Sequence, residues 1–379
     1  MFCADFLTLD FRDGHWYNAP APASLDMNDI NPRHILITGA AGFIGSSVLR
    51  HLWSRYPDAH FTVLDALTYA GDLRNIDTEL QQSGRFSFQH GDILDEGLVE
   101  RLVGAADYVL HFAAETHVSR SIHSDRQFFY TDVIGTQVIM HAVLKHRASI
   151  KRVVHISTSE VYGTARHPKM SESHPLEPQS PYAAAKVGAD RLVYSYYQTY
   201  QIPVVIVRPF NAYGTNQHPE KLIPRFITNA LLGEPLTIHG DGASERDFTH
   251  TRDIARALDL LLRAPAEVVE GEVFNIGNDA SISVRDIVVE LERAFARTGV
   301  RFGEVVSTVH VGDRPGQIAR HTADSEKIRT TLGWAPEVSF ADGLAEVVEW
   351  YAKNQSWWES KLEMRTVPIM MATGETENL

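Results

Sequence analysis

Short apolar runs of strand length recur through the first half of the chain, and each is followed by polar or helix-patterned sequence. They are HILIT at 34–38, HFTVLD at 60–65, DYVLH at 107–111, KRVVHI at 151–156 and PVVIV at 203–207. The runs are apolar throughout rather than alternating, which is typical of parallel strands covered on both faces. Strands that alternate with helices predict βαβ units. The expected fold class is therefore α/β, with a doubly wound parallel sheet.

The pattern changes after about residue 205. Proline and glycine become frequent, and helical periods return at 283–299 and 340–354. We expect a smaller C-terminal α/β substrate lobe here, with loops over the carboxyl ends of the first lobe's strands, where open α/β sheets bind ligands. The predicted parts are an N-terminal extension at 1–32, a cofactor-binding domain at 33–205, a substrate-binding lobe at 206–362 with some segments returning to the first domain, and a C-terminal tail at 363–379.

Composition narrows the choice of partners and location. The chain has 379 residues and a formal net charge of −13, which argues against nucleic acid or an anionic membrane as the main partner. Cys3 is the single cysteine and cannot form an internal disulfide, so a reducing, cytoplasmic location is expected. The first thirty residues do not have the pattern of a signal peptide, and no run approaches the roughly 20 apolar residues of a membrane span. The 18 histidines are scattered, and no metal is expected.

A glycine-rich turn follows the first predicted strand. Gly39, Gly42 and Gly45 are spaced G-x-x-G-x-x-G between a strand and a helix. Glycines let the backbone approach a pyrophosphate, and a helix N-terminus offers NH groups and a positive dipole end. This context favours a Rossmann-like dinucleotide site over a purely structural turn.

An acidic residue ends the second predicted strand. Asp65 lies 20 residues after Gly45, where a carboxylate can accept hydrogen bonds from an adenosine ribose and would repel a 2′-phosphate. No arginine follows directly, so the sequence favours NAD over NADP. Asp92, in HGDILD, is a candidate for contact with adenine, although such a residue is often only a strand-end cap.

A tyrosine and a lysine share one face of a predicted helix. Tyr182 and Lys186 are spaced i, i+4 in SPYAAAK. A neighbouring ammonium stabilises a phenolate, so we expect it to lower the pKa of the phenol and make it a usable base. Such a base can take the proton of an alcohol while the hydride goes to a nicotinamide. Thr158, on the preceding STSEVYG segment, can hydrogen-bond the same hydroxyl.

These motifs together resemble the extended short-chain dehydrogenases/reductases that act on nucleotide sugars, and most of all the dTDP-glucose 4,6-dehydratases. The resemblance covers about residues 33 to 360. It is carried by TGAAGFIG, LTYAGDLRNI, HFAAETHVSRSI, STSEVYG, SPYAAAK, HPEKLIPRFI, GDGASERDF and DRPGQIARHTADSEKIRTTLGW. The first and the fifth identify the superfamily, and the others are the more selective signals.

The resemblance implies a role for each matching residue. Tyr182 is the base, Lys186 its partner, and Thr158 holds the sugar 4-hydroxyl; Glu160 removes the C5 proton. The implied catalytic set is Thr158, Ser159, Glu160, Tyr182 and Lys186. The implied NAD site adds Gly39, Gly42, Phe43, Ile44, Gly45, Asp65, Asp92, Ile93, Ala113 and Ala114. The implied substrate site is Thr116, His117, Asn211, Lys221, Leu222, Arg246 and Arg314, and an arginine fork suits phosphate geometry.

Two residues depart from the dehydratase pattern. Ser159 stands where that pattern has an aspartic acid, which protonates the departing 6-hydroxyl in those enzymes, and a serine is a far poorer acid. Thr-Ser-Glu also resembles the motif of GDP-mannose 4,6-dehydratases, in which the glutamate would shuttle the proton itself. Asp132 stands where the family usually has a structural asparagine, beside Lys186.

The leading interpretation is an NAD-dependent nucleotide-sugar 4,6-dehydratase, a lyase of carbohydrate biosynthesis. A hydride moves from C4 to NAD, water leaves across C5–C6, and the hydride returns to C6 to give a 4-keto-6-deoxy sugar. Ser159 keeps open a nucleotide-sugar epimerase that works through the same 4-keto intermediate. A UDP-glucuronate decarboxylase and a non-catalytic NAD-binding protein on the same fold are further alternatives. The nucleotide and the sugar stay open.

We also expect a homodimer, mostly because related enzymes pair the helix that carries Tyr182 with its neighbour. The segments DRQFFYTDVIGTQVIMHAVLKH and PYAAAKVGADRLVYSYYQTY carry apolar and aromatic residues on more than one face. Such a pattern is consistent with a second buried surface.

Overall fold

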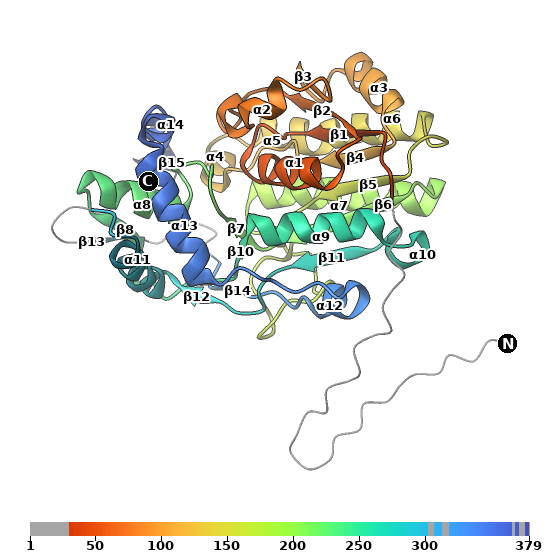
Figure 1. The fold of residues 1–379 in the computed structure, drawn as a ribbon. Helices are drawn as coiled ribbons and strands as arrows, with labels where there is room; N and C mark the ends of the chain where they lie inside the picture. Colours follow the sequence, from red (N-terminus) through yellow and green to blue (C-terminus); the bar gives the residue numbers. More distant parts are fainter. Residues whose placement is uncertain (1–29, 302–306, 313–317, 366–367, 371–375, 379) are drawn as a thin grey trace, which may run out of the picture.

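The computed structural model describes residues 30–301, 307–312, 318–365, 368–370 and 376–378. A seven-stranded sheet dominates it, with strand order β11–β6–β5–β4–β1–β2–β3 and every neighbouring pair parallel (Figure 1). The strands are β1 His34–Thr38, β2 His60–Asp65, β3 Phe86–His90, β4 Tyr108–His111, β5 Arg152–Ile156, β6 Val204–Pro209 and β11 Val273–Ile276. This arrangement confirms the predicted doubly wound α/β fold.

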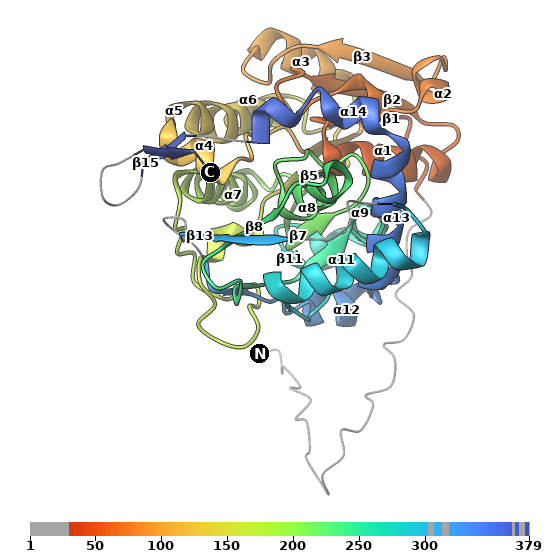
Figure 2. The same ribbon diagram turned by 90° about the vertical axis from the view of Figure 1, so that its left-hand side faces the viewer.

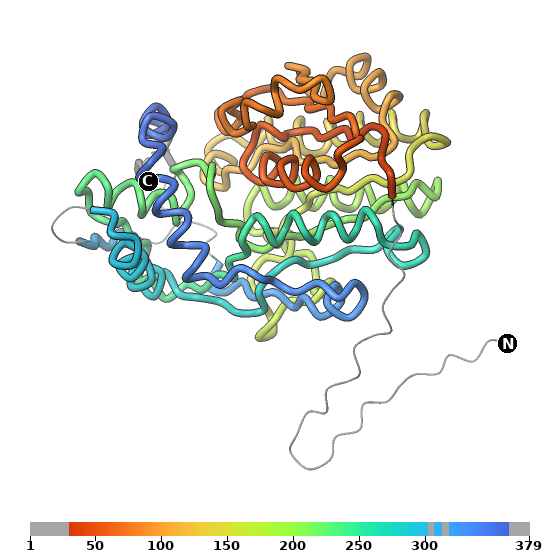
Figure 3. The backbone as a smooth tube through the Cα atoms, in the orientation of Figure 1, coloured from red at the N-terminus to blue at the C-terminus, as the bar shows by residue number. Residues whose placement is uncertain are grey.

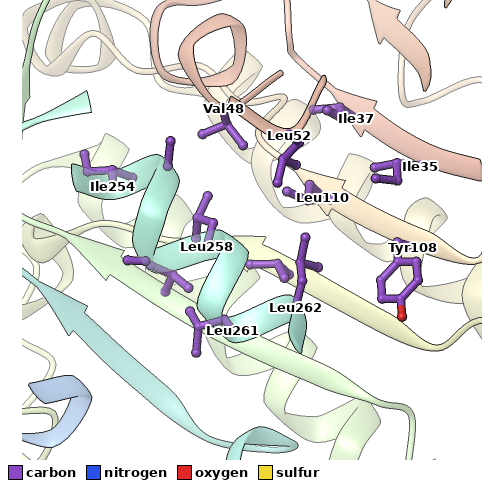
Figure 4. Packing of buried hydrophobic residues seen from close by; sticks show 14 of the residues in the cluster. Ile35, Ile37, Val48, Leu52, Tyr108, Leu110, Ile254, Leu258, Leu261 and Leu262 are labelled. Carbon is purple, nitrogen blue, oxygen red and sulfur yellow. The ribbon is translucent and has the colours of Figure 1, made fainter. Parts of the chain in front are cut away.

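Helices cover both faces of this sheet, which explains why its strands are apolar throughout. One face packs against α1 (Phe43–Arg55) and α9 (Thr251–Arg263), and Figure 4 shows their leucines and isoleucines meeting β1 and β4. The other face packs against α3 (Glu96–Ala105), α6 (Thr136–Lys145) and α7 (Pro181–Tyr200). Figure 2 shows the two helical layers on opposite sides of the sheet.

A second lobe has its own apolar core, shared by α8, α11 and α13. Its elements are α8 Leu222–Leu232, β8 Leu236–His239, β9 Glu245–Arg246, β12 Ile282–Ser283, α11 Val284–Thr298, β13 Thr308–Val311, β14 Arg320–His321, α13 Phe340–Lys353 and α14 Gln355–Glu359. The helical patterns at 283–299 and 340–354 are thus confirmed as α11 and α13. Both helices begin with a serine cap, Ser283 and Ser339, whose side chain accepts a backbone hydrogen bond.

The chain crosses between the lobes more than once. It returns to the large sheet for α9, β11 and α12 (Glu326–Leu332) before α13 completes the second lobe, as the tube in Figure 3 traces. The shorter elements are η1 Leu73–Asn75, α2 Thr78–Gln81, α4 Val118–His123, α5 Arg126–Phe128, η2 Phe129–Gly135, η3 Ser159–Tyr162, β7 Asn211–Tyr213, β10 Phe248–His250, α10 Ala266–Val269, η4 Leu362–Arg365, β15 Pro368–Met370 and β16 Thr376–Asn378.

Within the described ranges, no helix combines the length and the apolar character needed to cross a membrane. Cys3 and most of the N-terminal extension lie outside the described residues.

Candidate active site

A cavity of about 490 Å³ opens at the carboxyl ends of the parallel strands. Its walls come from the first lobe and from α8, β8 and β9 of the second. Every site residue expected from the sequence lines it except Arg314, which lies outside the described residues. The lining residues among them are Gly39, Gly42, Phe43, Ile44, Gly45, Asp65, Asp92, Ile93, Ala113, Ala114, Thr116, His117, Thr158, Ser159, Glu160, Tyr182, Lys186, Asn211, Lys221, Leu222 and Arg246.

The glycine turn forms one end of the cavity. Gly39 has φ +74°, and a Cβ on it would lie 2.6 Å from the backbone N of Ala113, so no other residue fits there. No side chain caps the N-terminus of α1, and no acidic residue lies in its first turn. This end can therefore accept a pyrophosphate through backbone NH groups and the positive end of the helix dipole.

Asp65 is held at the edge of the cavity by two backbone hydrogen bonds. Its Oδ2 accepts from the N–H of Ala41 and its Oδ1 from that of Leu67, both at 2.9 Å. Burial raises the pKa of Asp65, and the two bonds oppose that change. Each carboxylate oxygen has a second lone pair, so the side chain can still accept from ribose hydroxyls. Asp92 both caps the N–H of Leu94 and lines the cavity.

Asn75 connects the glycine turn to the C-terminal part of the chain, and sequence analysis missed it. Its Nδ2 donates to the carbonyl of Ala41 at 2.7 Å. Its Oδ1 accepts from Nε1 of Trp357 at 2.9 Å and from Nδ2 of Asn216 at 3.2 Å. Only the LTYAGDLRNI stretch pointed to this region, and nothing local indicated partners that are 141 and 282 positions away.

Tyr182 and Lys186 lie on α7, which begins with a Ser180 cap and Pro181 in its first turn. Tyr182 makes a hydrogen bond with Thr158. The ammonium of Lys186 donates to the carbonyl of Ile156 at 2.7 Å. The pair therefore sits between the end of β5 and the cavity.

One electrostatic expectation was wrong for this structure. Burial raises the pKa of the Tyr182 phenol above its usual value, and the bond with Thr158 only partly opposes that. Burial also lowers the pKa of Lys186, whose charge is directed at a backbone carbonyl. Desolvation therefore dominates the pKa of the phenol, rather than the ammonium that the i, i+4 spacing suggested.

Asp132 is a buried carboxyl beside this pair. Its Oδ1 accepts the N–H of Glu115 at 2.8 Å, and its Oδ2 has no hydrogen-bond partner. Burial raises the pKa of Asp132 to about 7, although Lys186 acts in the opposite direction. The departure from asparagine therefore places a titratable group next to Lys186.

Ser159 and Glu160 lie on the short helix η3, where the Thr158 hydroxyl accepts the N–H of Glu160 at 3.2 Å. Ser159 is buried. The Glu160 carboxylate reaches the cavity, and its Oε1 lies 3.9 Å from Nδ1 of His321. Arg246, across the cavity, has its pKa lowered by burial, and the charge of Glu160 opposes this.

Lys221 and its buried partner Glu220 lie at the opposite end of the cavity. Lys221 donates to the carbonyl of Thr116 at 3.0 Å and lies 3.3 Å from Glu220. Glu220 is almost fully buried and also meets Nε2 of His117 at 3.2 Å and the hydroxyl of Tyr69 at 3.1 Å. Sequence analysis missed Glu220 as a site residue, although it directly precedes Lys221 in HPEKLIP. It fixes the lysine at the cavity wall.

No cluster of three or more His, Cys, Asp or Glu side chains able to hold a metal occurs in the described part of the chain.

Comparison with known proteins agrees with this geometry. The family model for GDP-mannose 4,6-dehydratase matches residues 36–347. A dTDP-glucose 4,6-dehydratase from Actinoplanes sp. is 43% identical over 86% of this chain and 99% of its own. DesIV, a dTDP-glucose 4,6-dehydratase from Streptomyces venezuelae solved with NAD and TYD bound, superposes with a TM-score of 0.80, at 43% identity over 86% of this chain and 99% of that one.

Related activities share the fold at lower identity. A UDP-glucuronic acid 4-epimerase from Bacillus cereus, solved with UDP-glucuronic acid and NAD, has a TM-score of 0.77 at 32% identity, over 85% of this chain and 99% of that one.

The fold and the cavity thus define an NAD-dependent enzyme of the extended short-chain dehydrogenase/reductase class. Within that class the chain belongs to the GDP-mannose 4,6-dehydratase family, as a nucleotide-sugar 4,6-dehydratase. The predicted resemblance, the activity and the cofactor NAD are confirmed.

Proposed function

We propose that this cavity dehydrates a nucleoside-diphosphate hexose, with dTDP-glucose as the first substrate to test. The observation that carries the proposal is that Thr158, Glu160, Tyr182 and Lys186 line one cavity with the glycine turn at one end and Lys221 at the other. A sugar between them has a cofactor on one side and a cationic group for its diphosphate on the other. The relatives at 42–43% identity named as dTDP-glucose 4,6-dehydratases support this choice.

The first step is the oxidation of the C4 hydroxyl. When bound, NAD supplies the hydride acceptor at this step and the hydride donor at the last one. Tyr182 takes the proton of the hydroxyl, and Thr158 orients it through the hydrogen bond the two residues share. The phenol of Tyr182, whose pKa is raised by burial, would ionise more readily beside the positive charges of Lys186 and of the oxidised cofactor.

Glu160 carries the proton in the elimination. The 4-keto group acidifies the C5–H bond, because the resulting carbanion is conjugated with the ketone. Glu160 takes this proton and gives it to the departing 6-hydroxyl, which leaves as water. Ser159 cannot serve as the acid, since a serine hydroxyl is too weak. One carboxyl therefore performs both proton transfers of the elimination. When the hydride returns to C6, C5 takes a proton that comes from solvent, and the proton taken by Tyr182 is released to solvent.

The lobe at 206–362 is proposed to hold the nucleotide sugar, since Asn211, Lys221 and Arg246 come from it. The Oδ1 of Asn211 is buried without a hydrogen-bond partner, so it can accept a donor from the ligand. Lys221 and Arg246 supply positive charge for the diphosphate. The role of Arg314 stays a prediction.

The partner proposed for the first lobe is a second copy of this chain. Phe129, Tyr130 and Ile134 on η2 are 42%, 43% and 45% exposed, and Tyr200 on α7 is 44% exposed. These apolar side chains on two helices would be covered by pairing the same helices of another copy. Light scattering at micromolar concentration should give a dimeric mass, and Ile134→Lys should lower it. A monomeric native protein would contradict the pairing.

A cytoplasmic location also stays a prediction.

The substrate proposal is tested by incubating the NAD-loaded protein with dTDP-, UDP-, GDP- and CDP-glucose and with UDP-glucuronate, and measuring the masses of the products. Loss of one water from the dTDP sugar supports it. Isomerisation without a mass change would indicate the epimerase that Ser159 keeps open, and loss of carbon dioxide from UDP-glucuronate would indicate a decarboxylase. Turnover of another nucleotide sugar in preference to dTDP-glucose would overturn the substrate assignment alone.

A further inference from the structure

His321 is a fully buried histidine behind the catalytic carboxylate. It ends β14, which pairs in parallel with β9 so that His321 lies beside Arg246. Its Nε2 lies 2.7 Å from the carbonyl oxygen of Gly163. A carbonyl can only accept, so Nε2 carries the hydrogen, and in the neutral ring Nδ1 carries the lone pair.

That second nitrogen lies near the carboxylate of Glu160. Nδ1 has no hydrogen-bond partner and lies 3.9 Å from Oε1 of Glu160. The charged and titratable groups facing the ring are Glu160 on η3, Arg246 on β9 and His174 on the loop before α7. The ring of Phe210 packs edge-on against the imidazole, with 6.1 Å between centroids. Packing and the Gly163 bond therefore fix the direction of Nδ1.

An acceptor aimed at a carboxylate has no favourable contact while the carboxylate is ionised. It gains one as soon as the carboxyl is protonated, because the new O–H can donate to it. A shift of about 1 Å brings the two atoms within hydrogen-bond distance. Glu160 is in that protonated state only between taking the C5 proton and releasing it.

We propose that His321 is a positioning residue that accepts a hydrogen bond from Glu160 while Glu160 holds the C5 proton, an inference that rests on the proposed dehydration. The C5–H bond breaks, its electrons enter the carbanion conjugated with the C4 ketone, and its proton goes to Glu160. The C6–O bond then breaks, and the hydroxyl leaves with that proton as water. His321 gains and loses no proton over the cycle.

The protonation state of His321 agrees with this role. Burial lowers the pKa of His321, while the charge of Glu160 acts in the other direction. Because the folded pKa lies below the ordinary value, the ring is neutral at neutral pH and its Nδ1 is free to accept. Protonation at lower pH would replace the acceptor with a donor and bind Glu160 as an ion pair, so dehydration should fail there.

Two variants separate this role from a purely structural one. His321→Gln keeps a donor near the position of Nε2 and the bond to Gly163 but lacks an atom at Nδ1. His321→Asn keeps a polar atom near the position of Nδ1 and loses the bond to Gly163. If His321 acts through Glu160, His321→Gln should lower kcat about 10-fold or more, with a smaller change in KM, and His321→Asn should lose less.

The deciding readout is exchange of the C5 proton with solvent deuterium. In His321→Gln it should slow as kcat does, bound NADH should accumulate because C4 oxidation is untouched, and the acid limb of the pH profile should move to lower pH. The proposed role of His321 would be overturned if His321→Gln kept the native rate of C5 exchange and the native acid limb of the pH profile. It would also be overturned if His321→Asn lost more kcat than His321→Gln. Failure of the native enzyme to dehydrate any sugar would instead refute the proposed function.

A measurement on the native holoenzyme covers the case in which neither variant folds. In ¹⁵N-histidine NMR the resonances of His321 report its tautomer directly. An Nε2–H tautomer supports the proposal. An Nδ1–H tautomer or a doubly protonated ring at neutral pH would overturn it, since neither leaves an acceptor for Glu160.

Discussion

Asp132→Asn tests whether the ionised form of the buried carboxyl beside Lys186 destabilises the folded protein. The amide has the same shape, and its oxygen can keep the hydrogen bond from the N–H of Glu115. Only Oδ2 is replaced, an atom without a hydrogen-bond partner. An unpaired amide donor there costs about 1–3 kcal/mol. That cost does not depend on pH, so the pH dependence isolates the charge.

The magnitude follows from the pKa. Burial raises the pKa of Asp132 from 3.8 to about 7. The pKa of Asp132 in the folded protein lies above its value in the unfolded chain. The carboxyl therefore leaves the free energy of unfolding unchanged below pH 3.8, and it destabilises the folded protein increasingly until the pH passes the folded pKa. The two values differ by about 3, and each unit is about 1.4 kcal/mol, so the full cost is about 4 kcal/mol. At pH 5 it is about 1.7 kcal/mol by the same relation.

Replacing Asp132 with asparagine should therefore stabilise the protein by about 2–3 kcal/mol more at pH 8 than at pH 5, relative to the native chain. The assay is urea unfolding at both pH values with saturating NAD. Asp190→Asn is the matched control: burial alone would raise the pKa of Asp190, but its bonds to Arg208 outweigh this and lower it. Asp190→Asn should destabilise equally at both pH values. An equal effect of Asp132→Asn at pH 5 and pH 8 would refute the reasoning.

Three further substitutions probe separate parts of the cavity. Asp65→Ala should weaken NAD binding about 10-fold or more while leaving the fold intact, measured by calorimetry; tighter binding of NADP than NAD by the native protein would contradict its role. Lys221→Met should raise KM for the nucleotide sugar more than it lowers kcat, and Lys221→Arg should restore most of the loss; an unchanged KM would exclude contact with the diphosphate. Glu160→Gln should accumulate bound NADH on addition of substrate, whereas Tyr182→Phe should form none, and near-native turnover of either variant would remove it from the mechanism.

Much of the first lobe could be predicted because short stretches of the sequence mark its strands and the start of α1. Five apolar runs became β1, β2, β4, β5 and β6, and the glycine spacing located the start of α1. The runs that became β3 and β11 were not recognised. β3 lies at the edge of the sheet, and Phe86 and Phe88 alternate with polar residues that are only partly covered, so it lacks a continuous apolar run. β11 is a four-residue strand with a buried Asn275 in it.

The candidate site was predictable where one short motif holds both partners. Tyr182 with Lys186 and Lys221 with Leu222 are of this kind. His321 and Glu160 are 161 positions apart, and the contact of His321 with the carbonyl of Gly163, next to η3, brings them together in the fold. No local sequence pattern predicts a contact between residues so far apart in the chain. Desolvation is equally invisible in the sequence, which is why the effect of Lys186 on the phenol was misjudged.

The most direct test of the whole account is a single-turnover reaction with dTDP-glucose carrying deuterium at C4. The account predicts a product lighter by one water, with the deuterium moved to C6, solvent hydrogen at C5, and no net consumption of NAD. This outcome requires C4 oxidation, proton removal at C5 and return of the same hydride to C6 in one cavity. Deuterium retained at C4 of an isomerised sugar, or its loss to free NADH, would contradict the account.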